Sequence, residues 1–214
     1  MPKLRILKGS SFGLKSMNYL LISNQGEGLY KEKGSKFLSF AYLLTHAGHA
    51  KELIDEIKTL HFDANHCCYA YSYGLEIPMF GAHDDGEPKY SAGDPILGQI
   101  KAFNVSNALV VVVRYFGGTK LGAGGLSNAY RQAAAAALTK AALLPYIEKE
   151  RFKIFYDYDQ TKLLLSLFRD YDTEIIEKKY LQKCWMLVDV KKEEAMAFED
   201  RLQRNAFQFK NDIK

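Results

Sequence analysis

The chain has no apolar run that approaches the roughly 20 residues of a membrane-spanning helix. Near the N-terminus, basic residues are followed by an apolar run of only Tyr19 to Ile22, which is too short for the core of a signal peptide. At 48% hydrophobic and 25% charged residues, the composition is that of an ordinary soluble globular protein. We therefore expect a cytoplasmic protein with no membrane partner.

Cysteine is scarce as well. The 214 residues include three, an adjacent pair at Cys67 and Cys68 and a distant Cys184. This spacing matches neither a disulfide framework nor a zinc site. We expect the three thiols to be reduced and to pack as small apolar residues, and we assign no metal site and no cofactor to the chain.

The chain also lacks a strong charge of one sign, because its net charge is only +4. Residues 148–214 hold 14 basic and 14 acidic residues, so the excess lies in residues 1–147, much of it at the N-terminal end. This excess suits contact with nucleic acid phosphates, but it falls well short of a polybasic tract. On charge alone, a solvated surface explains it better.

The pattern of apolar segments predicts an α+β protein of two domains. We expect residues 17–145 to form the first domain and residues 146–214 the second. Residues 1–16 show no periodicity and are interpreted as a mobile leader, with Met17 as an alternative natural start. The second domain shows the order β-α-β-β-α-β, which is typical of a ferredoxin-like fold. Many functions use that fold, so it indicates none of them.

The stretch from Val110 to Ala137 organises the first domain. An apolar, β-branched run predicts a strand buried on both faces, and an alanine-rich run predicts a helix that ends near Pro145. Upstream, residues 79–93 have the composition of a loop. Asp94 and Pro95 then predict the N-cap and the first position of another helix.

Between the buried strand and the alanine-rich helix lies a segment with five glycines, which are Gly117, Gly118, Gly122, Gly124 and Gly125. Such a loop can present backbone N–H groups and a helix N-terminus to an anion, and Lys120 could reach that anion. Arg131 follows in the helix as a further phosphate contact or a solvated charge. The segment matches neither a P-loop nor a dinucleotide fingerprint. Glycines that only turn the chain sharply remain an equal explanation.

The predicted loop holds three carboxylates, Asp84, Asp85 and Glu87, within a stretch of four residues. Carboxylates so close together need a cation, an arginine partner or water. They could hold Mg²⁺ through water, act as a general acid–base pair, or tie the loop to Arg114 or Lys120. Arg114 ends the buried strand, so it needs either one of these carboxylates or a bound phosphate.

Two further residues are candidates to line a site. His66 precedes Cys67 in a predicted strand, where adjacent side chains face opposite ways, so the two cannot form one catalytic pair. His66 alone remains a lining residue, together with Tyr115, which can pack or stack on a base. We assign no catalytic residue.

These motifs resemble those of the IMPACT family, whose bacterial branch is called YigZ. The matching segments are Lys33-Gly34-Ser35-Lys36-Phe37, Ala64-Asn65-His66-Cys67, Asp84-Asp85-Gly86-Glu87-Pro88, Pro95-Ile96-Leu97, Arg114-Tyr115-Phe116-Gly117-Gly118 and Lys120-Leu121-Gly122 with Gly124-Gly125-Leu126. The chain departs from the family at Lys89-Tyr90-Ser91 and at Asn128, where an arginine is usual. The second departure removes one candidate phosphate contact.

The resemblance implies an N-terminal domain with the left-handed β-α-β fold of a small-subunit ribosomal protein and of domain IV of the translocating elongation factor. It implies a second domain similar to domain V of that factor, and no catalytic activity. We therefore predict a non-enzymatic RNA- or ribosome-binding protein that modulates translation, with RNA, the ribosome or a protein of the translation machinery as partner. The alternatives are an enzyme or sensor for a small phosphorylated ligand at the glycine loop 117–125, and a purely protein-binding module.

Overall fold

The computed structural model describes residues 19–75, 77–180 and 184–211. The predicted leader, residues 1–16, lies outside this range. The chain divides into two compact units between Tyr146 and Ile147, and each is described by itself. The architecture mixes helices with several sheets, as expected for an α+β protein. None of the described helices is long and apolar enough to cross a membrane.

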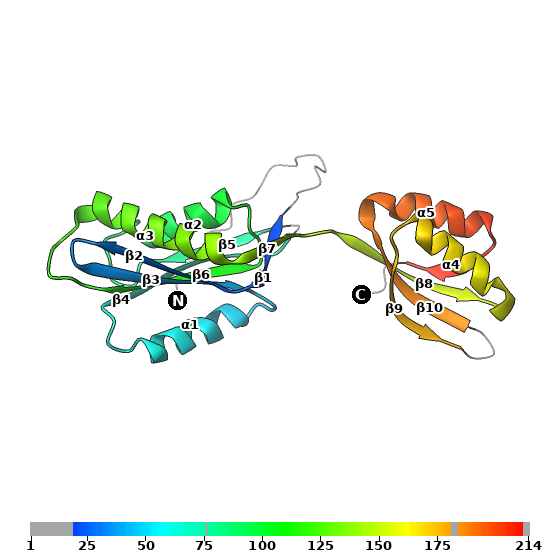
Figure 1. Cartoon of the computed structure of the whole chain (residues 1–214), viewed down its shortest axis with the longest axis horizontal. Coiled ribbons are helices and arrows are strands. Elements are labelled where there is room, and N and C mark those ends of the chain that lie inside the picture. Colours follow the sequence, from blue (N-terminus) through cyan, green and yellow to red (C-terminus); the bar gives the residue numbers. More distant parts are fainter. Residues whose placement is uncertain (1–18, 76, 181–183, 212–214) are drawn as a thin grey trace. The chain divides into compact units, whose positions relative to one another are not determined.

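The first unit is built on a five-stranded sheet with the order β2-β3-β6-β4-β5, in which every neighbouring pair is antiparallel (Figure 1). The strands are β2 (Gly26–Glu32), β3 (Ser35–Leu43), β4 (His66–Tyr73), β5 (Met79–His83) and β6 (Ala108–Tyr115). The central strand β6 is buried from Ala108 to Arg114. Its apolar residues are continuous because helices cover both faces of the sheet.

Helices α2 (Gly93–Ala102) and α3 (Gly122–Lys140) lie on one face, and α1 (His49–Leu60) lies on the other (Figure 1). The alanines of α3 allow its backbone to approach β2 closely. A Cβ placed on Gly26 would lie 2.1 Å from the carbonyl oxygen of Ala137, and one on Gly28 would lie 2.7 Å from its nitrogen. Small residues on both elements therefore set the distance between helix and sheet.

The sequence misassigns the secondary structure of two segments in this unit. The alanine-rich helix ends at Lys140 and not near Pro145, because Ala141 is extended and β7 (Ala142–Pro145) pairs with β1 (Leu20–Asn24). The predicted loop at residues 79–93 begins instead with strand β5, which pairs with β4. Pairing with the distant strand β1 decides the conformation of β7, and pairing with the preceding strand β4 decides that of β5.

The second unit follows the order β8 (Lys149–Tyr156), α4 (Thr161–Asp170), β9 (Glu174–Lys179), β10 (Cys184–Lys191), α5 (Lys192–Arg204) and β11 (Gln208–Lys210). Its antiparallel sheet has the strand order β11-β8-β10-β9. Both helices pack on the same face around an apolar core that includes Phe152, Met186 and Phe198. A 3₁₀ turn, Tyr158–Gln160, precedes α4. Its capping box is made by Asp157 with Gln160.

Candidate functional site

Asp84 is the cap of helix α2. Its carboxylate accepts hydrogen bonds from the backbone N–H groups of Ala92 (3.0 Å), Gly93 (2.8 Å) and Tyr90 (2.9 Å). The predicted cap, Asp94, lies inside the first turn and makes no capping hydrogen bond. A carboxylate at a helix N-terminus satisfies donors that would otherwise lack partners and interacts favourably with the helix dipole. Asp84 therefore anchors the acidic loop to α2.

Asp85 ties the same loop to β4 and α1. Its carboxylate accepts a 2.7 Å hydrogen bond from the backbone N–H of Cys67, and it pairs with Lys58 at 3.1 Å. Burial alone would raise the pKa of Asp85, but these two donors outweigh it and hold the pKa below its ordinary value. The Asp85 carbonyl accepts from Nδ1 of His66 at 2.9 Å, which makes Nδ1 the protonated nitrogen of that ring. Lys58, absent from the sequence prediction, is thus a partner of the loop.

Glu87 and Arg114 form a buried ion pair. Arg114 Nη1 lies 2.7 Å from Glu87 Oε1, and the two side chains are 6% and 4% exposed. The same oxygen accepts a 2.7 Å hydrogen bond from the Tyr130 hydroxyl. The guanidinium carbon lies 5.5 Å from the ring centroids of both Phe37 and Phe116. Of the partners that the sequence left open for Arg114, the structure brings it to Glu87, and so little exposure leaves no direct approach for a phosphate.

The neighbouring cysteines are buried on opposite faces of β4, Cys67 toward α1 and Cys68 toward α3. The Cys68 sulfur lies within hydrogen-bonding distance of the Asp84 carbonyl oxygen (3.0 Å) and of the Tyr130 hydroxyl oxygen (3.3 Å). Burial raises the pKa of Cys67 to about 11, and it raises the pKa of Cys68 and of Tyr130 far above their ordinary values. These groups stay protonated at neutral pH, so neither thiol is an activated nucleophile.

Within the described residues, no group of three or more histidine, cysteine, aspartate or glutamate side chains is arranged to hold a metal ion. Glu87 Oε1 lies 3.9 Å from His66 Nε2, which brings the lining residue His66 to the edge of the buried pair. Tyr130 and Cys68 complete this cluster. Neither residue could be predicted from the sequence, because an apolar alanine-rich helix gives no signal that one tyrosine hydroxyl reaches a carboxylate.

The segment after β6 is held rigidly. The backbone N–H of Gly117 donates to Ser35 Oγ at 3.1 Å, and that of Phe116 donates to Asn65 Oδ1 at 2.7 Å. A Cβ on Gly117 would lie 1.9 Å from the carbonyl carbon of Gly34. Only glycine fits at this close approach, so Gly117 has a purely steric role.

Helix α3 begins at Gly122, within the segment that the sequence analysis interpreted as one loop. Gly122, Gly124 and Gly125 therefore belong to its first turn. Leu121, at the N-cap position, provides no side-chain hydrogen bond, and the first turn contains no acidic residue. Within the described residues, no side chain accepts a hydrogen bond from the first N–H groups of this 19-residue helix, and these groups carry the positive end of its dipole.

The surface around this helix start is open. A Cβ built on Gly118, Gly122 or Gly124 would meet no atom within 4 Å. Gly118 and Gly122 have φ values of +85° and +71°, and this left-handed backbone conformation explains why both residues are glycine. Gly124 has neither a positive φ nor a close neighbour. Glycine there weakens the helix and has no structural reason within the described part of the chain.

Lys120 is exposed directly before the helix, and within the described residues it forms no ion pair. The predicted tie between the acidic loop and Lys120 is absent, and Lys58 takes that place. Arg131 is exposed, but it lies nine residues beyond Gly122, or about 13 Å along the helix axis. The Tyr115 hydroxyl contacts Asp63 and His61, which places the tyrosine on the side of α1.

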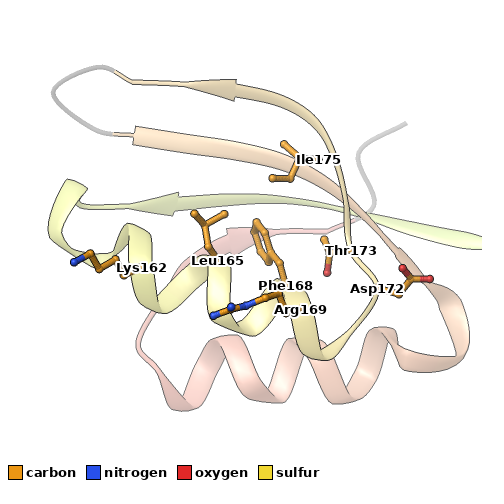
Figure 2. Close-up of a pocket in the computed structure, with 7 residues that line it drawn as sticks. All are labelled: Lys162, Leu165, Phe168, Arg169, Asp172, Thr173 and Ile175. Carbon is orange, nitrogen blue, oxygen red and sulfur yellow. The ribbon is translucent and has the colours of Figure 1, made fainter.

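Two hollows lie elsewhere. One, of about 460 Å³, lies between α1 and the strands β4 and β5; its lining includes Tyr69, Tyr71 and Tyr73. The other, of about 780 Å³, lies in the second unit beside α4 and β9 (Figure 2). Neither includes a glycine of the 117–125 segment.

The comparisons with known proteins identify the family. Residues 33–138 match the Impact N-terminal domain. The IMPACT family member YvyE of Bacillus subtilis is 30% identical over 86% of this chain and 84% of its own length. The chain belongs to the IMPACT family. The resemblance drawn from the motifs is therefore confirmed.

Two other relatives agree with this membership. The IMPACT family member YigZ of Escherichia coli is 31% identical over 69% of this chain and 74% of its own length. A crystal structure of a hypothetical protein has a TM-score of 0.62 and 27% identity, and the match covers 90% of this chain and 96% of that one. These matches extend well beyond residue 138, so similarity to known proteins is not confined to the Impact N-terminal domain.

Proposed function

We propose that this IMPACT family member is a non-enzymatic, cytoplasmic RNA- or ribosome-binding protein that modulates translation, and that it contacts RNA phosphates at the start of α3. One observation carries the proposal. The start of α3 is an exposed, uncapped helix N-terminus beside Lys120, with a glycine at position 124 that the surrounding structure does not require. A phosphate backbone supplies the negative charge and the close approach that this surface suits.

The proposal assigns a fold class to each of two domains, residues 17–145 and residues 146–214. We assign the first to the left-handed β-α-β class of translation factors, as its motifs imply, and the second to the ferredoxin-like class, which its strand order β11-β8-β10-β9 supports. Both assignments fit a protein that faces the ribosome or RNA.

The acidic loop supports a non-enzymatic role. Asp84 caps α2, Asp85 binds Lys58 and a backbone N–H, and Glu87 is buried against Arg114. Each carboxylate thus has a structural partner inside the unit, and a general base must instead be free to reach a substrate proton. The groups that resemble an active site in the sequence connect elements of the fold to one another.

Fluorescence anisotropy with a short labelled single-stranded RNA at two salt concentrations tests the proposal. We expect binding that weakens as salt rises, and a Lys120→Ala variant whose log–log salt slope is shallower by about 0.7 for the one lost phosphate contact. The control is Lys140→Ala, an exposed lysine in the last turn of the same helix, which should bind as wild type does. Absent or salt-independent RNA binding would overturn the proposal.

Gly124→Ala tests the glycine directly. The added methyl group enters open space, so it should leave the fold intact while it obstructs the approach of a phosphate to the first turn. Gly98→Ala is the matched control, because Gly98 lies in α2 and its Cβ would also meet no atom within 4 Å. We expect only the first variant to weaken RNA binding.

The same uncapped N–H groups also favour a second candidate, a small phosphorylated ligand. A thermal-shift screen of phosphorylated metabolites separates the two candidates. A saturable stabilisation that disappears in Lys120→Ala, in a protein that binds no RNA, would favour the small ligand.

A further inference from the structure

The sheet of the second unit has one face without a helix. Alternate residues of β8 and β10 point to α4 and α5 and are buried, among them Phe152, Ile154, Met186 and Val188. The intervening residues point to the opposite face, and they are only partly buried. Figure 2 shows α4 and α5 on one side of the sheet, and no described element of this unit covers the other side.

Two aromatic residues lie next to each other on this open face. Phe155 of β8 and Trp185 of β10 are direct partners in the antiparallel register, and Trp185 is the single tryptophan of the chain. The ammonium nitrogen of Lys153 lies 3.9 Å from the Trp185 ring centroid and 5.8 Å from that of Phe155. Since a cation sits over the face of a ring and not at its edge, each ring turns a flat face toward the Lys153 ammonium group on this side of the sheet.

Lysines from three different strands surround this aromatic pair. Lys153 lies on β8, Lys179 on β9 is the register partner of Trp185, and Lys210 on β11 is the register partner of Lys153. Direct partners in antiparallel strands share a face, so all three belong to the open side. Lys179 also has Glu177 at 3.4 Å. Within the described residues, Lys153 and Lys210 have no carboxylate partner.

At the other end of the same face the charges cancel. Arg151 makes two hydrogen bonds of 2.7 and 2.8 Å to Asp189, and Lys149 pairs with Glu174. The open face is therefore polarised, with an aromatic and basic end and a neutralised end. A ligand that matches the first end combines flat aromatic rings with regularly spaced negative charges.

We propose that the aromatic end of this face binds single-stranded RNA, with bases stacked on Trp185 and Phe155 and phosphates near Lys153, Lys179 and Lys210. The inference rests on the proposed RNA-binding function and adds to it a second site in the other unit. Unpaired bases are required, because in a duplex their faces are already stacked on neighbouring bases. The flexible Lys153 side chain moves from the rings to a phosphate when a base arrives.

The emission of Trp185 tests the inference, because no other tryptophan contributes to it. Titration of the full-length chain with a short single-stranded RNA should quench this emission saturably, with the same midpoint as the anisotropy of the labelled RNA. A duplex of the same length should not quench it. Binding without quenching would overturn the inference, as would equal quenching by the duplex.

Anisotropy with variants supplies an independent readout. Trp185→Leu and Phe155→Leu keep apolar side chains but remove the stacking surface, and each should weaken binding about tenfold or more. Their salt slopes should stay unchanged, whereas Lys153→Gln should make the slope shallower by about 0.7. The matched controls are Tyr158→Leu, which removes a 77% exposed ring from another surface of the same unit, and Lys162→Gln on α4. Both should bind as wild type does.

Failure of this inference is distinct from failure of the proposed function. If Lys120→Ala weakens RNA binding and makes its salt slope shallower but Trp185→Leu and Phe155→Leu leave binding unaffected, the second site is absent and the first remains. If the wild-type chain binds no RNA at all, both the proposed function and the inference are wrong. If only the variants of the sheet lose binding, the inference holds and the contact at α3 is wrong.

Discussion

Replacement of Glu87 by glutamine should destabilise the first unit strongly. The change keeps an oxygen that accepts from Tyr130, but it removes the negative charge 2.7 Å from Arg114. The guanidinium would then be a buried charge without a counterion, at 6% exposure. Loss of one partner of a buried ion pair costs about 3–5 kcal/mol in free energy of unfolding, and we expect a value in that range for Glu87→Gln.

The measurement is hydrogen exchange of the β6 amides under native conditions, combined with urea unfolding followed by circular dichroism. The β6 amides report the stability of the first unit, whereas Trp185 fluorescence reports the second unit and should keep its wild-type midpoint. Lys58→Gln is the control, because the Lys58–Asp85 pair is 44% and 25% exposed. Its loss should cost no more than about 1 kcal/mol.

A double variant, Glu87→Gln with Arg114→Met, completes the test. Removal of both charges eliminates the uncompensated cation, so stability should recover part of the loss. If the free energy of unfolding of Glu87→Gln lies within about 1 kcal/mol of the wild-type value, the ion pair does not stabilise the position of the loop. Arg114 would then be available for another partner.

Three further predictions concern the acidic loop and the adjoining strand β4. Asp84→Ala leaves three backbone N–H groups without their acceptor and should lower the free energy of unfolding by about 2 kcal/mol, as measured in urea; a wild-type midpoint would show that α2 does not depend on this cap. The Cys67 thiol, whose pKa burial raises to about 11, should react with a chromogenic disulfide near pH 8 only after unfolding, and rapid native reaction would contradict its burial. Because the pKa of Asp85 is held below its ordinary 3.8, its contribution to stability is complete above that value and is lost as pH falls below it. Melting temperatures of wild type and Asp85→Asn should therefore converge in acid, and a constant difference would refute the assignment.

The parts of the fold that could be predicted from the sequence are those that local pattern decides. The continuous apolar run marked the central strand β6, which is buried from Ala108 to Arg114. Strand β7 could not be predicted, because residues 142–145 continue an alanine-rich helix in composition and become extended only by pairing with β1. Strand β5 carries exposed residues without alternation, so its pairing with β4 is equally invisible in the sequence.

The candidate site shows the same limit at the level of side chains. The carboxylates, the arginine and the glycines were all found as a group, because charge in an irregular segment and glycine after a buried strand are unusual. Their partners were found only in part. Asp94 has the expected sequence of an N-cap, yet Asp84, ten residues upstream, fulfils that role through the fold. Nothing in the local pattern distinguishes these two carboxylates.

The Gly124→Ala variant distinguishes a purely structural role of this glycine from a role in RNA binding, because the two roles predict different affinities for RNA. Alanine in an exposed helical turn is favoured over glycine by about 0.5–1 kcal/mol, and the added methyl group meets no atom within 4 Å. If the glycines at the start of α3 served only the turn, Gly124→Ala would raise the melting temperature and change nothing else. If the backbone of this turn meets a phosphate, the same variant would be more stable and bind RNA less tightly. Higher stability with unchanged affinity would show that Gly124 does not contact the ligand.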